Sequence, residues 1–154
     1  MRLVFAAAVA AICAVPASAE PNLQQTVTAF LNAYAAGDKA AVINALEPEV
    51  QFYGSDVSEV YRGAQGASDM FDADMKLWGG TARFGTMWHV SGARDGRLAS
   101  IMFDVPFTAG KNPTVTVRFA MAWVLDGGEW KLVQSSNTVP TVGQNARDVP
   151  KAAP

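Results

Sequence analysis

The C-terminal half of the chain alternates apolar and polar residues between short turns, and this pattern most limits what the protein can fold into. Asp95-Gly96 is a favoured two-residue hairpin turn, and longer turns follow at 109–113 and 126–129. Short turns join strands that lie side by side, so the pattern predicts an antiparallel meander. Its strands are expected at 83–93, 98–108, 114–125 and 130–138.

Symmetric pairing about these turns sorts the side chains onto two faces of the sheet. The first face is large and aromatic, so other elements must cover it: Phe84, Trp88, Val90, Ile101, Phe103, Val105, Phe107, Val117, Phe119, Met121, Trp123 and Leu132. The second face is small and mixed, which suits partial exposure or a packed partner: His89, Met102, Asp104, Arg118, Ala120, Ala122, Val133, Ser135 and Asn137.

The N-terminal half supplies helices that can cover the aromatic face. An apolar stripe with helical spacing runs from Leu23 to Tyr34, and Gly37 is expected to stop that helix. Asp38 can cap a second helix that carries Val42, Ile43 and Leu46 and ends at Pro48. A short strand with Val50 and Phe52 follows, and then a third helical stripe of Ala67, Met70, Phe71, Asp74 and Trp78. These elements predict an α+β fold, a curved antiparallel sheet with three N-terminal helices forming a cone.

The first nineteen residues have the pattern of a secretory signal peptide. Arg2 precedes an apolar run from Leu3 to Val15, and the small residues Ala17-Ser18-Ala19 precede Glu20. The run is shorter than the ~20 residues that cross a bilayer. We therefore expect a signal peptide at 1–19, one domain at 20–144 and a disordered tail at 145–154. The expected location is outside the cytoplasm, in a bacterial periplasm, with no membrane attachment after cleavage.

Composition excludes several kinds of partner. The chain has 12 basic and 14 acidic residues without a basic run, so nucleic acid is not an expected partner. Its single cysteine, Cys13, lies in the predicted signal, and His89 is its single histidine. The carboxylates that remain show no metal-binding spacing, so we expect neither a metal nor another cofactor.

Two stretches resemble a known family. Ala29 to Phe71, with its turn motif GSDVSEVYRG, is similar to the opening of the SnoaL-like branch of the nuclear transport factor 2 superfamily. Arg118 to Pro140 is similar to the terminal hairpin of that branch, and the resemblance extends over 22–143. It implies a cone-shaped fold. It leaves the activity open, because the superfamily contains isomerases, cyclases, dehydratases and non-catalytic binders.

The last predicted strand carries the candidate polar anchors for a ligand. Gln134, Ser136 and Thr138 are in phase with Trp130 and Leu132, so we expect them to point into the cone. Alternatively, they lie at the wet mouth of the sheet. Relatives often have histidine at the position of Ser136, and its absence argues against proton transfer there. The expected apolar walls of the ligand site are Trp88, Phe103, Phe119, Met121 and Trp123.

The resemblance also suggests a catalytic pair. Ketosteroid-isomerase relatives use an aspartate after the first strand and a tyrosine on the first helix, and this chain has Gly54 and Phe30 there. Asp56 and Tyr34, each displaced along its element, form a candidate acid–base pair. The alternative for Asp56 is ordinary turn chemistry. The predicted register places His89 on the second sheet face, which favours a structural or surface role.

The second sheet face is a candidate subunit interface. Asp104 and Arg118 fall opposite each other on neighbouring strands, close to the small residues Ala120 and Ala122. Flat small residues around one ion pair suit a two-fold contact, so we expect a homodimer. A ligand clamp formed by the ion pair is the alternative.

Together these features predict an exported protein that binds a small, largely apolar molecule in its cone without a cofactor. The first alternative is a cofactor-independent isomerase, cyclase or dehydratase that uses an acid–base carboxylate. The second is a dimerisation or partner-binding module whose cone is filled by its own side chains.

Overall fold

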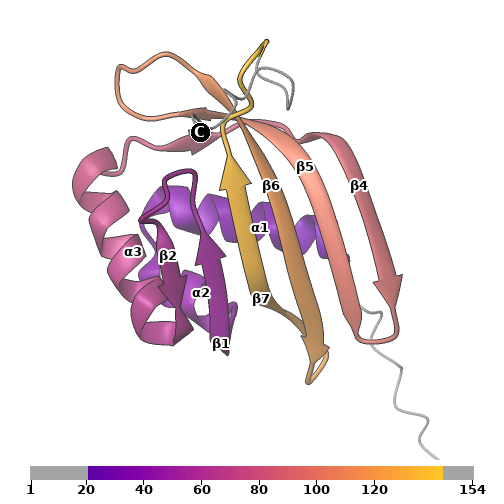
Figure 1. Ribbon diagram of the computed structural model, residues 1–154. Coiled ribbons are helices and arrows are strands. Elements are labelled where there is room, and N and C mark those ends of the chain that lie inside the picture. The colour runs from indigo at the N-terminus through magenta and orange to yellow at the C-terminus, as the bar shows by residue number, and fades with distance from the viewer. Residues whose placement is uncertain (1–20, 144–154) are drawn as a thin grey trace, which may run out of the picture.

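The computed structural model describes residues 21–143, which form three helices and one seven-stranded sheet (Figure 1). The predicted signal peptide and C-terminal tail lie outside the described residues. The elements in chain order are α1 (Leu23–Ala36), α2 (Lys39–Asn44), β1 (Leu46–Tyr53), β2 (Val60–Arg62), α3 (Gly63–Trp78), β3 (Arg83–Phe84), β4 (Trp88–Asp95), β5 (Leu98–Thr108), β6 (Val115–Asp126) and β7 (Glu129–Thr138).

The first two helices begin and end as the sequence predicts, apart from the last residues of the second. The side chain of Asn22 accepts a hydrogen bond of 3.1 Å from the backbone N–H of Gln25, which caps α1. Gly37 follows α1 with a left-handed φ of 77°, a conformation that glycine adopts without steric cost. Asp38 then caps α2 by accepting a hydrogen bond of 3.0 Å from the N–H of Ala41.

The predicted end of the second helix is wrong. α2 ends at Asn44, and Leu46 already belongs to β1, where it lies opposite Leu132 of β7. Pro48 therefore stands inside a strand. It is tolerated there because the register of β1 against β7 shifts between Leu46 and Gln51, where a missing backbone donor does little harm.

The strand order is β2-β1-β7-β6-β5-β3, and β4 also pairs with β5. The strands of the C-terminal meander pair antiparallel, as predicted, but β1 and β7 pair in parallel, so the sheet is mixed. Parallel pairing is possible because α3 and the strands from β2 to β6 lie between these two strands in the sequence. The expected segment 83–93 forms two separate strands, β3 and β4, which pair with opposite ends of β5.

The helices cover one face of the curved sheet and leave the other uncovered (Figure 1). α1 lies across the sheet, and α3 packs beside β1 and β2 to close one side of the cone. Phe30 of α1 meets Trp123 of β6 edge-on, with 5.8 Å between the ring centroids. Phe103 and Phe119 stack at 5.3 Å on the inner face of the sheet. These contacts confirm the predicted α+β cone.

The register between β5 and β6 also matches the prediction. Phe103 lies opposite Phe119, and Asp104 lies opposite Arg118. The inner, helix-covered face thus receives the aromatic side chains, and the outer face receives the ion pair.

A β-bulge reverses the predicted phase of β7. Trp123 pairs with Leu132, but the next residue of β6, Ala122, pairs with Gln134, which leaves Val133 as the extra residue. A slip of one residue moves every later side chain to the other face. The structure therefore places Gln134, Ser136 and Thr138 opposite the outer-face residues Ala122, Ala120 and Arg118, and their predicted inward orientation is wrong.

A second bulge displaces Trp88 from the aromatic face. The register of β4 against β5 shifts between Trp88 and Ser91, so Trp88 lies opposite Asp104 and its side chain is 37% exposed. His89, within this bulge, has a positive φ of 50°, which is uncommon for a residue with a side chain. The predicted core position of Trp88 is wrong, whereas His89 lies near Asp104 on the outer face, as expected.

Candidate ligand-binding cleft

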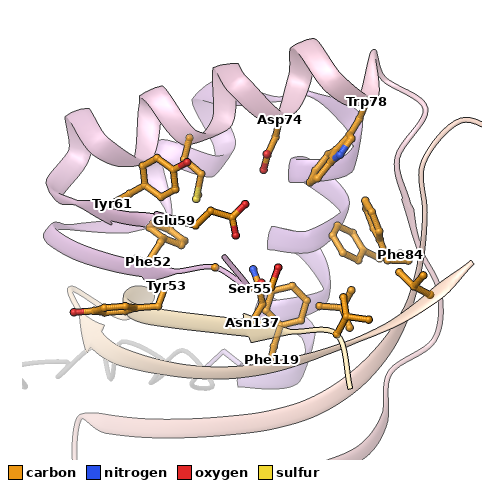
Figure 2. Close-up of a pocket in the computed structure, with 16 residues that line it drawn as sticks. Phe52, Tyr53, Ser55, Glu59, Tyr61, Asp74, Trp78, Phe84, Phe119 and Asn137 are labelled. Carbon is orange, nitrogen blue, oxygen red and sulfur yellow. The ribbon is translucent and has the colours of Figure 1, made fainter. Parts of the chain in front are cut away.

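A cleft of about 240 Å³ opens at the end of the cone, between α3, the turn that joins β1 to β2, and the ends of β6 and β7 (Figure 2). A smaller inner chamber of about 70 Å³ lies behind it and shares part of its wall, including Asp74, Trp78 and Asn137. The inner chamber adds Phe30, Tyr34, Met121 and Ser135. The cone is therefore not filled completely by its own side chains.

Asp74 and Tyr34 form the innermost polar pair of the site. The hydroxyl of Tyr34 on α1 donates a hydrogen bond of 2.7 Å to Oδ2 of Asp74 on α3. Burial raises the pKa of Asp74, the negative charge of Glu59 raises it further, and the bond from Tyr34 opposes both effects. Burial, and then the charge of Asp74, raise the pKa of Tyr34 far above its ordinary range. The tyrosine is thus a permanent donor at neutral pH, and the carboxyl group holds its proton more tightly than usual.

Glu59 is the second acidic group of the cleft. It ends the turn between β1 and β2, where its Oε2 accepts a hydrogen bond of 3.0 Å from the backbone N–H of Asp56. The side chain folds back over Gly54, and a Cβ at that position would lie 2.6 Å from the Glu59 Cβ. Only glycine leaves room for this close approach. The turn thereby holds the carboxylate of Glu59 over the cleft, facing the same space as Asp74 (Figure 2).

The neutral polar groups come from β7, one residue away from those that the sequence predicts. Ser135 lies opposite Met121 and is 3% exposed, and Asn137 lies opposite Phe119 with its amide toward the cleft (Figure 2). The remaining wall is mostly aromatic. Phe107 is central to it, with its ring 4.9 Å from that of Trp78 and 5.1 Å from that of Phe84.

The expected apolar walls of the ligand site separate into three groups. Phe119 lines both the cleft and the inner chamber, and Met121 lines the inner chamber. Phe103 and Trp123 are 1% and 0% exposed and serve as packed core. Trp88 lies on the outer side, together with the polar residues Gln134, Ser136 and Thr138.

The structure does not bring the predicted catalytic pair together. Asp56 is exposed, and its Oδ1 accepts hydrogen bonds of 2.8 and 2.5 Å from the backbone N–H and the hydroxyl of Ser58. These bonds lower the pKa of Asp56, which behaves as an ordinary turn residue. The partner of Tyr34 is Asp74 instead.

Asp74 could have been identified from the sequence. It stands on the apolar stripe of the third helix, four residues after Met70 and four before Trp78. A carboxylate on a core-facing stripe needs a partner or a solvent-filled space, and here it has both. The inward orientation of Ser135 and Asn137 had no such signal, because it depends on the bulge at Val133.

On the outer face, the carboxylate of Asp104 is held by hydrogen bonds from two side chains. Two guanidinium nitrogens of Arg118 donate to the two carboxylate oxygens of Asp104 at 2.7 and 2.9 Å. Nδ1 of His89 donates to Oδ2 at 3.0 Å. The bonds from Arg118, and then that from His89, lower the pKa of Asp104 to about 2. Asp104 is only 3% exposed because its partners cover it, and exposed Ala120 and half-buried Ala122 lie beside them.

Within residues 21–143, no group of three acidic, histidine or cysteine side chains is arranged to hold a metal ion. None of the helices in this part of the chain combines the length and the apolar character needed to cross a membrane.

The chain has the cone-shaped α+β fold of solved nuclear transport factor 2-like structures. The chain belongs to the SnoaL-like domain family, whose profile matches residues 23–141. A comparison with curated proteins gives no significant match.

Many solved structures match this chain. A candidate dehydratase of the NTF2-like family from Streptomyces avermitilis matches with a TM-score of 0.69 and 16% identity, over 77% of this chain and 94% of that one. A candidate ketosteroid isomerase from Parabacteroides distasonis matches with a TM-score of 0.63 and 12% identity, over 79% and 90%. A candidate calcium/calmodulin-dependent protein kinase II association domain from Xanthomonas campestris gives 0.69 and 16%, over 84% and 94%. At these identities the likeness establishes the fold alone.

Proposed function

We propose that this protein binds a small, largely apolar molecule that carries one polar group. The observation that supports the proposal is the open cleft, whose aromatic wall is interrupted by a few oriented polar side chains. Pockets that bind small molecules combine these two features. The apolar body would lie against Trp78, Phe84 and Phe119, and its polar group would reach Asn137 or the acidic pair.

The proposal can be tested with a simple neutral probe, 4-phenylbutan-1-ol, followed by the NMR signals of the Trp78 indole and the Asn137 amide. Asn137→Leu should keep the fold and weaken binding by about 0.5–1.5 kcal/mol, the usual contribution of one neutral hydrogen bond. Gln134→Leu is the matched control, because Gln134 lies on the outer face of the same strand. Binding that is absent, or that depends on Gln134 rather than Asn137, would contradict the proposal.

An acid–base enzyme is the second candidate, with Asp74 in the role that the sequence suggested for Asp56. The supporting observation is the raised pKa of a half-buried carboxyl group that has a tyrosine donor beside it. An ionised Asp74 would abstract a proton from the carbon next to a carbonyl group. The hydroxyl of Tyr34 would donate a hydrogen bond to the negative charge that develops on the carbonyl oxygen. Deuterium exchange into cyclohexanone, followed by NMR, should then proceed with the wild type and stop in Asp74→Asn. Equal exchange by both proteins would reject the enzyme.

We further propose that two copies pair through the outer face of the sheet. Ala120 and Ala122 are small, Met102 is 49% exposed, and Asp104 is already paired within its own chain. A face of this kind can pack without leaving a charge unpaired. Native mass spectrometry would give the number of subunits, and a monomer at micromolar concentration would retire this part of the proposal.

We also propose that the protein is exported and begins at Glu20 after cleavage. The support is the charged start, the short apolar run and the small residues before Glu20 in the sequence. N-terminal sequencing of the protein from a periplasmic fraction is the test. Intact Met1 in a membrane fraction would contradict export by cleavage.

A further inference from the structure

The acidic side chains of the cleft have no cationic side chain beside them in the described lining. Glu59 and Asp74 both line it, whereas no lysine, arginine or histidine does so among the described residues. Some acidic groups outside the cleft do have cationic partners, as in the pairs of Asp72 with Lys39 and Asp126 with Arg97. The cleft is therefore a local region of negative potential.

The two carboxylates also interact with each other across the cleft. The charge of Glu59 contributes to the raised pKa of Asp74, although Tyr34 donates a hydrogen bond to the same group. Neighbouring like charges disfavour ionisation, and a cation placed between them would remove that penalty. An anionic ligand would add a third negative charge in the same space.

The aromatic wall suits a positive charge as well as an apolar body. Trp78, Tyr61 and Phe84 surround the space that the carboxylates face (Figure 2). Aromatic faces attract cations through their quadrupole, and tryptophan does so most strongly. Carboxylates together with aromatic faces are a combination that recognises amines and quaternary ammonium groups.

Contacts within the turn fix the side chain of Glu59 over the cleft. Its carboxylate accepts from the backbone of Asp56, and its side chain packs on the bare Cα of Gly54. Gly54→Ala would force the carboxylate away, because the added methyl group would overlap it. The turn thus presents one acidic group at the mouth, and α3 presents the other further in.

We propose that the ligand of this cleft is an organic cation, with an apolar body and a protonated amine or quaternary ammonium group that lies between Glu59 and Asp74. This inference rests on the proposed binding function and names the chemical class of its ligand. Because a proton on Asp74 competes with the cation, binding should weaken as the pH is lowered through the titration of that carboxyl group.

Three probes with one body and different charge test the inference: 4-phenylbutylamine, 4-phenylbutan-1-ol and 4-phenylbutanoate, titrated by calorimetry at pH 7.5. The affinity for the amine should exceed the affinity for the alcohol by about tenfold or more, and the carboxylate should bind most weakly. Glu59→Gln and Asp74→Asn should each reduce the preference for the amine over the alcohol. The matched controls are Glu49→Gln on β1 and Asp72→Asn on α3, both exposed, and they should keep the preference.

The possible outcomes separate this inference from the function on which it rests. If the alcohol binds as well as the amine, or the carboxylate binds best, the inference of a cationic ligand is wrong and the binding function stands. The inference is also wrong if Glu59→Gln and Asp74→Asn both keep the full preference for the amine. If none of the three probes binds, the proposed function fails and the cation inference fails with it.

Discussion

Two aspartates on opposite sides of the sheet, Asp104 on β5 and Asp74 on α3, show how differently one side chain can be used. Asp104, on the outer face, receives two hydrogen bonds from Arg118 and one from His89, and its pKa falls to about 2. Asp74, in the cone, receives one hydrogen bond from a neutral hydroxyl, and burial raises its pKa. The first carboxylate is paired with cationic side chains within the fold. The second has only a neutral partner, and it borders an open cleft.

This difference indicates where function lies. A carboxylate whose partners are complete contributes to the structure and offers nothing to a ligand. A carboxylate with a raised pKa in a cleft is typical of binding and catalytic sites. The outer face is therefore the candidate packing surface and the inner face the candidate chemical surface, and each of the following predictions tests one side of that comparison.

The largest effect is expected on the outer face. If two subunits pack there, Ala122→Arg would bury an unpaired charge at a cost of several kcal/mol and convert a dimer to a monomer. Light scattering measures the change in mass. Ala64→Arg on exposed α3 is the control and should leave the mass unchanged. A dimer that survives Ala122→Arg would place the interface elsewhere.

A bulky side chain should distinguish the two faces of β7. Ser135→Trp inserts an indole where the inner chamber has about 70 Å³, so it should destabilise the fold by about 1–3 kcal/mol and weaken alcohol binding. Ser136→Trp, one residue further, should leave the cleft open, because Ser136 lies opposite Ala120 on the outer face. Urea unfolding and probe titration check both variants. The reverse order of effects would mean that β7 has no bulge at Val133.

Acid should act on Asp104 in a defined pH range. Its folded pKa is depressed from 3.8 to about 2, so its stabilising effect is present above 3.8 and is lost as the pH falls toward 2. Asp104→Asn should cost about 1 kcal/mol at pH 7 and flatten the loss of stability over that range. Urea unfolding at several pH values is the measurement, with Asp95→Asn at the exposed end of β4 as control. An unchanged acid profile would contradict the pairing of Asp104 with Arg118 and His89.

The smallest effect is expected from the hydroxyl of Tyr34. Tyr34→Phe removes one hydrogen bond to Asp74, so stability should fall by about 0.5–1.5 kcal/mol and the pKa of Asp74 should rise further. Because that pKa is raised in the folded state, ionisation of Asp74 lowers stability as the pH rises above 3.8 toward the raised value. Tyr53→Phe is the control, since no hydrogen bond joins Tyr53 to Asp74 among the described residues. A variant that behaves like this control would remove Tyr34 from the site.

Much of the fold follows from the sequence because it depends on local signals. The cap at Asp38 and the left-handed Gly37 are short-range features that the structure confirms. The hairpin predicted at Asp95-Gly96 also forms, but its two-residue turn is Gly96-Arg97, because Asp95 pairs with Leu98. The pairing of Asp104 with Arg118 could also be predicted, since both strands run regularly between them.

The polar part of the site could not be predicted in the same way. A bulge at Val133 inverts β7, and nothing in the alternating sequence indicates where the extra residue falls. The carboxylate pair of the cleft joins a turn to a helix, so it depends on tertiary packing. Asp74 alone gave a signal, as a charge on an apolar helical stripe.

The central claim is that the fold raises the pKa of Asp74 and lowers the pKa of Asp104. One NMR titration of the side-chain carboxyl carbons can test it. We expect Asp104 to titrate near pH 2 and Asp74 clearly above the ordinary value of 3.8. Addition of 4-phenylbutylamine should lower the pKa of Asp74 and leave that of Asp104 unchanged. If Asp74 titrates at or below 3.8 in the free protein, the cone holds no unmatched carboxylate and the account of this site is wrong.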